Sequence, residues 1–413
     1  MDLPDLGDSS GRVLSAESER EYSEGLLRQL RNYGLSIDDA ELVEYYETLA
    51  NRLVQASGRT ETRFHFELID VPVVNAFASP GGLVVTFSEL MLQADNESEL
   101  AGVLSHEIAH VTQRHIARAM ESSIEDVLPI LIGAVALAVA TRGQGDGGQA
   151  AMAGGIALMQ QRQINFTRDN EHEADRVGIQ TLAKAGFDPS GMADFFAKIG
   201  LLNRTQGEKP PEYLQSHPVT TTRIAEAKAR ADKLRVGTQQ TSLDFALMRE
   251  RLRVLTSREL PTLVRFYKDS KRARDVDKRA QSYGLALAQS RLGAHAEARE
   301  ALTLLADGDP HRLSYQLALA EVDRAERQFD AADERYQRLL AERPGHRVIS
   351  IAYARSQIER DTPDAGKRAV DVLRPLMRNY GDDPSLQELY ARANQLAGDP
   401  VRAAEAYAQA FFL

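Results

Sequence analysis

The pattern of apolar and polar positions predicts a chain that is mostly helical, with one short β-rich segment. Residues 15–57 carry apolar positions at helical spacing, begin at Ser and Asp caps and end at glycines, which predicts two helices. Residues 64–93 instead alternate and carry Pro, Asn and Gly-Gly turn signals, which predicts a small sheet of two or three strands. Helical spacing returns as one helix over residues 96–121 and a helix pair over 168–201. The expected fold class is therefore α+β, mostly α.

Two runs without charged residues, 127–141 and 149–161, are separated by a glycine-rich break. Neither run reaches the ~20 residues that a helix needs to span a bilayer. Together they predict an apolar helical hairpin over residues 127–161. Three interpretations remain open for this hairpin: a buried core element, a lid over a cleft, or a surface that contacts a membrane or an unfolded protein.

The last third of the chain repeats itself. A set of apolar, small and proline positions within residues 298–344 recurs after 34 residues, and a second set within 369–410 recurs after the same interval. The spacing between the two sets is 37 residues, from Ala332 to Ala369, which predicts a three-residue insertion near residues 360–366. A 34-residue period is typical of tetratricopeptide repeats, whose helical hairpins stack into an α-solenoid with a concave protein-binding surface.

These patterns predict two domains, residues 1–236 and residues 243–413, and composition limits what they do. A chain of 413 residues exceeds the size that one hydrophobic core usually supports. The net charge of −10 argues against non-specific nucleic-acid binding. The absence of cysteine excludes disulfides and thiolate chemistry but does not decide the compartment. The first ten residues lack signal-peptide features, so the protein is either cytosolic or numbered from a mature N-terminus.

The segment "SHEIAHVTQRH", residues 105–115, carries the candidate chemistry. On a helix, His106 and His110 lie one above the other on the same face, so both imidazoles can reach one zinc ion at ~2.0–2.1 Å. Glu107 lies ~100° around the helix, from where it can reach a metal-bound water and accept its proton. This arrangement predicts a metallopeptidase site, in which Glu107 argues against a purely structural zinc domain.

Catalytic zinc needs a third protein ligand, and the segment "NEHEADRVG", residues 170–178, offers one. Glu171 and Asp175 are four residues apart and share a helix face. Glu171 can bind the metal, while Asp175 can accept a hydrogen bond from a ligand imidazole and fix its tautomer. Glu173 points to another side of the helix and is a weaker candidate.

The other histidines are mostly interpreted as structural. His115 is nine residues after the first motif histidine, about 180° around a continuous helix, and is therefore predicted to face away from the metal. His217 opens the segment "HPVTTTR". It is either a turn histidine before a proline, or a fourth ligand, outer-shell group or oxyanion stabiliser. Arg223 either fixes that loop or binds a carboxylate.

Four motifs in this order, "NAFASPGG", "SHEIAH", "NEHEAD" and "HPVTTTR", followed by tetratricopeptide repeats, resemble the gluzincin peptidase family that includes the CAAX prenyl proteases, and within it the periplasmic β-barrel assembly-enhancing type. The resemblance implies one zinc ion per chain. It implies the following roles: zinc ligands His106, His110 and Glu171; general base Glu107; orienting carboxylate Asp175; an active-site histidine, placed to be a fourth ligand, His217; and substrate contacts at Asn75, Ala76, Phe77 and Arg223.

The resemblance also implies a cellular role. We expect a zinc endopeptidase in periplasmic quality control and assembly of outer-membrane proteins, in a mature chain whose signal peptide has been removed. Its substrates would be unfolded or stalled outer-membrane proteins, its repeat domain would bind the β-barrel assembly machinery, and its apolar hairpin would allow peripheral membrane contact. The alternative is a chaperone or partner-binding repeat protein whose peptidase site is normally closed, because a site with four protein ligands has no place for water.

Overall fold

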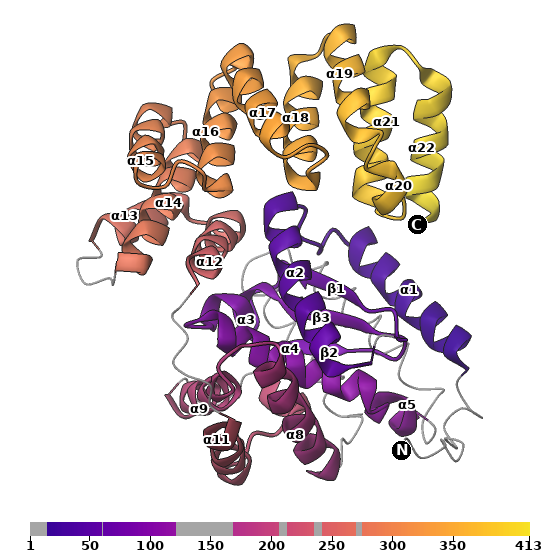
Figure 1. The fold of residues 1–413 in the computed structure, drawn as a ribbon, viewed down its shortest axis with the longest axis vertical. Coiled ribbons are helices and arrows are strands. Elements are labelled where there is room, and N and C mark those ends of the chain that lie inside the picture. Colours follow the sequence, from indigo (N-terminus) through magenta and orange to yellow (C-terminus); the bar gives the residue numbers. More distant parts are fainter. Residues whose placement is uncertain (1–14, 60, 121–167, 206–212, 235–241, 270–274) are drawn as a thin grey trace, which may run out of the picture. The chain divides into compact units, whose positions relative to one another are not determined.

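The computed structural model describes residues 15–59, 61–120, 168–205, 213–234, 242–269 and 275–413 (Figure 1). They group into two compact units, one from Met1–Ile37 and Tyr45–Ser242 and one from Asp38–Glu44 and Leu243–Leu413. The hairpin predicted over 127–161 lies outside the described residues. Within the described ranges, no helix combines the length and apolar character that crossing a membrane requires.

The first unit contains the small sheet that the alternation predicts. β1 (His65–Ile69) and β3 (Leu83–Phe87) run parallel, and β2 (Ala76–Ala78) pairs with β3 antiparallel, which gives the order β1-β3-β2 and leaves β2 at an edge. Gly81 makes the turn before β3 at a φ of +85°, and a Cβ there would lie 2.2 Å from the carbonyl oxygen of Glu19. Only glycine fits that turn.

The described part of the first unit also contains helices. They are α1 (Ala16–Asn32), α2 (Ala40–Ser57), α3 (Ser88–Gln93), α4 (Glu97–Thr112), α5 (His115–Met120), α8 (Arg168–Lys184), α9 (Ser190–Thr205), α10 (Tyr213–Ser216) and α11 (Thr221–Leu234). The apolar face of α1 packs on β1 and β3 through Leu26 and Leu30. The α+β, mostly helical prediction is thereby confirmed.

Helix α4 lies at the centre of the first unit, with α8 and α9 packed against it. Glycines set how closely these helices approach. A Cβ on Gly102 of α4 would lie 2.8 Å from the backbone of Met192 in α9, and one on Gly178 of α8 would lie 3.1 Å from the backbone nitrogen of His106. A side chain at either position would push the partner helix away from α4.

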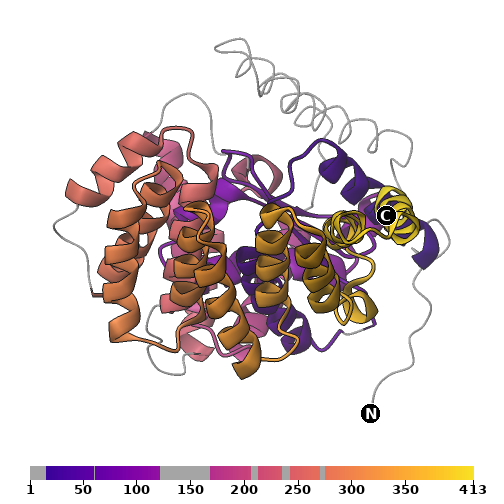
Figure 2. The ribbon, with the colours of Figure 1, turned by 90° about the horizontal axis from the view of Figure 1, so that it is seen from above.

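The second unit is an α-solenoid of helical hairpins, each packed against the next (Figures 1 and 2). Its helices are α12 (Leu243–Thr256), α13 (Leu260–Asp269), α14 (Asp275–Arg291), α15 (His295–Gly308), α16 (Leu313–Ala325), α17 (Phe329–Glu342), α18 (Arg347–Arg360), α19 (Pro363–Leu373), α20 (Met377–Tyr380), α21 (Pro384–Ala397) and α22 (Pro400–Phe412).

The starting residues of these helices correct the position of the predicted insertion. Helices α15, α17 and α19 begin 34 residues apart, whereas α21 begins 37 residues after α18. The three extra residues therefore lie between the starts of α19 and α21, where the short α20 intervenes, and not near 360–366. Gly366, rather than Ala369, occupies the place that Ala332 has in the preceding hairpin. The prediction was wrong because Ala369 is also a buried small residue and offered a false match.

The segment Asp38–Glu44, which the predicted division into 1–236 and 243–413 placed in the first domain, groups with the second unit. Arg251 explains this grouping. Its guanidinium donates two hydrogen bonds of 2.8 Å to the carboxylate of Asp39 and one of 2.8 Å to Glu321 Oε1, and Arg251 and Asp39 are both buried. No sequence pattern indicated this ion pair, because its partners are 212 residues apart.

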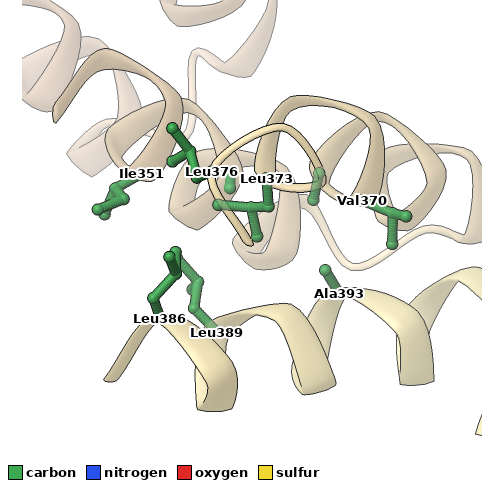
Figure 3. Close-up of a cluster of buried hydrophobic side chains, with 9 residues drawn as sticks. Ile351, Val370, Leu373, Leu376, Leu386, Leu389 and Ala393 are labelled. Carbon is green, nitrogen blue, oxygen red and sulfur yellow. The ribbon is translucent and has the colours of Figure 1, made fainter. Parts of the chain in front are cut away.

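Near the end of the solenoid, α18, α19 and α21 enclose an apolar cluster (Figure 3). The cluster comprises Ile351, Ala354, Ala369, Val370, Leu373, Leu376, Leu386, Leu389 and Ala393. Beside it, α19 crosses α21 closely. A Cβ on Gly366 would lie 2.5 Å from the backbone nitrogen of Ala397. The space between the two helices at Gly366 is therefore narrower than at the equivalent position of the preceding hairpin, which carries Ala332.

We predict that Gly366→Ala destabilises the second unit, although alanine favours helices, because the added methyl meets backbone. Overpacking of this kind costs about 1–3 kcal/mol. Gly308→Ala is the matched control, since no atom lies within 4 Å of a Cβ built there. Urea unfolding followed by far-UV circular dichroism should show a lower midpoint for Gly366→Ala only. An unchanged midpoint would show that α19 and α21 can separate without cost.

Candidate metal centre

Helix α4 presents the two motif histidines in the interior of the first unit. Asn96 caps the helix by accepting a hydrogen bond from the backbone nitrogen of Glu99, and every residue from 98 to 110 is buried. His106 and His110 lie on one face, with ring centroids 4.7 Å apart and their Nε2 atoms separated by 3.0 Å. Both side chains are at most 1% exposed.

Helix α8 brings a carboxylate to the same point. Glu171 is 2% exposed. Its Oε2 lies 3.6 Å from His106 Nε2, and its Oε1 lies 3.4 Å from His110 Nε2. Gly178, two turns further along α8, permits the close approach to α4 that these distances require.

His217 completes the cluster from the end of α10. Its backbone nitrogen donates to the carbonyl of Tyr213 at 2.8 Å, and its ring stacks on the Tyr213 ring at 4.9 Å. Its Nδ1 lies 3.1 Å from Glu171 Oε1 and 3.3 Å from His106 Nε2. His217 is therefore placed with the motif histidines, and the interpretation as an unrelated turn residue fails.

The cluster formed by His106, His110, Glu171 and His217 fits a metal ion. One donor atom from each residue lies within 4.8 Å of the others. Ligands bound tetrahedrally to zinc at ~2.0–2.2 Å are ~3.3 Å apart. Donor separations of 3.0–3.6 Å within the cluster, measured to either carboxylate oxygen of Glu171, surround that value. Nitrogen and carboxylate donors in this number are those that zinc prefers.

Charge supports the same conclusion. The carboxylates of Glu107, Glu171 and Asp175 are all buried, and Arg223 is the buried cation beside them. Ionised, these four groups sum to two negative charges, which a divalent cation balances. Glu107 Oε1 is a buried atom with no hydrogen-bond partner among the described residues, and His217 Nε2 is 3.5 Å away. A carboxylate placed beside the donor cluster without being part of it can accept a proton.

Asp175 and Arg223 contact His106 and Glu171 from outside the cluster. Asp175 Oδ1 lies 3.0 Å from His106 Nδ1, on the side of the ring away from the cluster. Arg223 donates two hydrogen bonds of 2.8 Å to Asp175, pairs with Glu171 Oε2 at 2.7 Å, and donates to the carbonyl of Pro218 at 2.8 Å. The guanidinium is buried and engaged with protein groups, which favours the loop-fixing interpretation of Arg223 over contact with a substrate.

The pKa values of the site residues reflect two opposing effects, which are burial and the hydrogen bonds to these partners. Burial lowers the pKa of His106, but hydrogen bonds to Asp175 and Glu171 outweigh it and raise the pKa to about 9. For Asp175, burial is outweighed by hydrogen bonds from Arg223 and His106, and its pKa falls to about 2. Burial keeps the pKa of His110 well below its usual value. The site therefore favours an ionised Asp175 beside a protonated His106, and metal binding would displace a proton from His106.

The prediction for His115 was wrong. The expected helix over 96–121 is broken: α4 ends at Thr112, Arg114 adopts a φ of +54°, and α5 begins at His115. The break turns His115 back toward the cluster, where its Nδ1 lies 3.0 Å from His110 Nδ1. Glu173, expected to point elsewhere, lies 3.1 Å from His115 Nε2. A left-handed arginine carries no sequence signal, so periodicity alone could not find this contact.

The predicted substrate-contacting residues Asn75, Ala76 and Phe77 lie at β2. Within the described ranges β2 pairs on one side only, with β3, and α4 packs against it. The backbone nitrogen of Tyr213 donates to the carbonyl of Val74 at 3.2 Å, so the chain entering β2 is tied to the segment that carries His217. The edge strand β2 and the cluster are thus both in contact with α4 and with the segment that begins at Tyr213. Binding of substrate at β2 stays a prediction.

Comparison with known proteins gives the site its context. Residues 40–231 match the model of peptidase family M48. The chain is 34% identical to the β-barrel assembly-enhancing protease of Yersinia pestis, over 96% of this chain and 81% of the relative, and 35% identical to that of Escherichia coli K12, over 95% and 80%. It is 29% identical to the mitochondrial metalloendopeptidase OMA1 of Bos taurus, over 52% and 41%. The chain therefore belongs to peptidase family M48 and is a metalloendopeptidase, similar over almost its whole length to the β-barrel assembly-enhancing proteases.

Proposed function

We propose that this chain is a zinc endopeptidase of the periplasm that acts in quality control and assembly of outer-membrane proteins, and that His217 holds its site closed at rest. The observation that carries the proposal is the convergence of His106, His110, Glu171 and His217 on one buried point. The names of the relatives support the cellular role, and the identity over 95% of the chain includes the repeat region.

Zinc, when bound, supplies a Lewis acid and an acidified water. The remaining chemistry belongs to side chains of this chain. Glu107 lies beside the donor cluster without joining it, so it serves as the base that accepts a proton during attack and passes it to the leaving amine. Asp175 fixes the tautomer of His106, since a proton held on Nδ1 leaves Nε2 free to bind the metal.

His217 decides whether the site is open. Its Nδ1 faces the ligand set, and its Nε2 faces Glu107 Oε1 at 3.5 Å. In this position the histidine would supply a fourth ligand to a bound zinc ion and would lie beside the base Glu107, which would leave no place for a water molecule or a substrate carbonyl. We infer that proteolysis requires His217 to leave this position, which makes the closed arrangement a latent state.

The other parts of the molecule have roles consistent with this proposal. An extended peptide would add to the edge of β2 at Asn75, Ala76 and Phe77, which places its backbone near α4. The tetratricopeptide-like solenoid over 243–413 offers a surface for stalled outer-membrane proteins or for the β-barrel assembly machinery. The alternative is a binding protein without proteolysis. It differs from the proposed peptidase because opening the site would not lead to cleavage of a substrate.

We predict that Glu107→Gln abolishes proteolysis without loss of zinc. The amide cannot accept the proton, which costs about 10²–10⁴-fold in rate, whereas the metal ligands remain intact. Casein cleavage and zinc content should be measured on the same preparations. Glu226→Gln is the matched control, because Glu226 pairs with His172 and Arg230 away from the cluster. Retained cleavage by Glu107→Gln would remove this residue from the mechanism.

We predict that His217→Ala increases casein cleavage, because the fourth position becomes accessible to water while three ligands still hold the zinc. His172→Ala serves as the comparison, since His172 is a half-buried histidine of α8 paired with Glu226. A fall in cleavage with zinc retained would assign His217 to transition-state stabilisation instead. No cleavage by either the wild type or His217→Ala would favour the binding-protein alternative.

A further inference from the structure

His115 and Glu173 form a hydrogen-bonded branch behind the second motif histidine, which runs from a buried imidazole to a half-exposed carboxylate. His115 is 0% exposed. Its Nδ1 lies 3.0 Å from His110 Nδ1, its Nε2 lies 3.1 Å from Glu173 Oε2, and the two imidazole rings are 5.0 Å apart at 76°. The branch lies on the opposite side of His110 from the donor cluster, because His110 meets that cluster through Nε2.

We propose that His115 and Glu173 are positioning residues that fix the tautomer and orientation of His110 for metal binding. This inference rests on the metal site of the proposed function and adds residues to it. Helix α8 then supplies Glu171 and, further along the same helix, the partners behind both motif histidines: Asp175 for His106 and Glu173, through His115, for His110.

The position of the metal decides which ring nitrogens of the branch carry a proton. A metal on His110 Nε2 requires the lone pair there, so the proton of the neutral ring lies on Nδ1. That Nδ1–H needs an acceptor, and the atom 3.0 Å away is His115 Nδ1, which must then be unprotonated. The proton of His115 therefore lies on Nε2 and is donated to the Glu173 carboxylate. Along this branch the direction of each hydrogen bond sets the direction of the next one.

The geometry explains why α4 breaks where it does. A continuous helix would carry His115 to the opposite side of α4 from the metal. The positive φ of Arg114 reverses the chain instead, and the Arg114 guanidinium is held by Glu19 Oε1 at 2.7 Å. A non-glycine residue in the left-handed region is strained, and such strain is kept where the surrounding contacts hold the backbone in place.

The carboxylates of the two branches differ in exposure, which makes the branches separable by experiment. Asp175 is buried and bound by Arg223, whereas the carboxylate of Glu173 is 37% exposed and pairs with Arg176 at 3.5 Å. Outer-shell partners of ligand histidines typically change metal affinity about 10–100-fold when they are removed. Because a neutral imidazole lies between Glu173 and His110, we expect the effect of Glu173 to be transmitted only when His115 is present.

The test is zinc affinity of the full chain, measured by competition with a fluorescent chelator. His115→Phe keeps the ring but removes the acceptor, and should weaken zinc binding about 10–100-fold. His115→Gln retains a carbonyl acceptor and should recover most of the affinity. Glu173→Ala, at a half-exposed position that tolerates truncation, should weaken binding by a smaller factor. His172→Phe is the control. His172 also lies on α8 but pairs with Glu226, so this variant should bind zinc like the wild type.

The decisive measurement is the double variant. If the branch acts as one unit, adding Glu173→Ala to His115→Phe changes the zinc affinity no further. Urea unfolding of the metal-free variants separates a purely structural role from this one. Wild-type zinc affinity in both His115→Phe and Glu173→Ala, or fully additive losses in the double variant, would overturn the inference while leaving the proposed function intact. Failure of the wild type to bind zinc would overturn the proposed function itself.

Discussion

The structure of the first unit depends on balancing charge that has been removed from water. Glu107, Glu171 and Asp175 are each at most 2% exposed, and burial of an ionised carboxylate costs several kcal/mol unless it is compensated. Arg223 compensates one charge through direct pairs with Asp175 and Glu171. A divalent ion at the cluster of His106, His110, Glu171 and His217 would compensate the remaining two. Folding of this unit and metal binding would then be parts of the same energy balance.

Close helix packing makes that balance geometrically achievable. The ligands come from α4, α8 and the end of α10, and their donor atoms can meet only if the helix backbones approach closely. Gly102 and Gly178 remove the side chains that would separate α4 from α9 and α8. A Cβ on Gly191 would likewise lie 2.4 Å from the backbone of Ser98. Gly178 thus lets the helix that carries Glu171 approach the helix that carries His106 and His110, whereas Gly102 and Gly191 let α9 pack closely on that same helix.

Much of the site could be predicted because its functional side chains recur at helical spacing. The i, i+4 spacing places His106 above His110, and the same spacing places Glu171 and Asp175 on one face of α8. Those inferences need only helical geometry, and the structure brings all four residues together. The sheet was predictable for the same reason, since alternation and turn residues are local signals.

What sequence reasoning missed depends on irregular backbone and long-range pairing. His115 lies against His110 only because Arg114 leaves the helical region. Arg251 pairs with Asp39 from 212 residues away, and the extra residues of the solenoid were misplaced because Ala369 imitates the small residue that Gly366 supplies. A periodic pattern describes regular elements, and these features lie where elements end, break or cross.

The same buried cation that stabilises the ligands also bears on how the site would open. Arg223 donates to the carbonyl of Pro218, the residue after His217, while its other donors bind Asp175 and Glu171. The guanidinium that holds this loop thus also holds Asp175 and Glu171. Under the proposed latency, movement of His217 away from the fourth position would end its stacking on Tyr213 and its contacts with Glu171 and His106. Arg223 binds Asp175 through two hydrogen bonds and would keep it beside His106, so the orientation of that imidazole does not depend on His217.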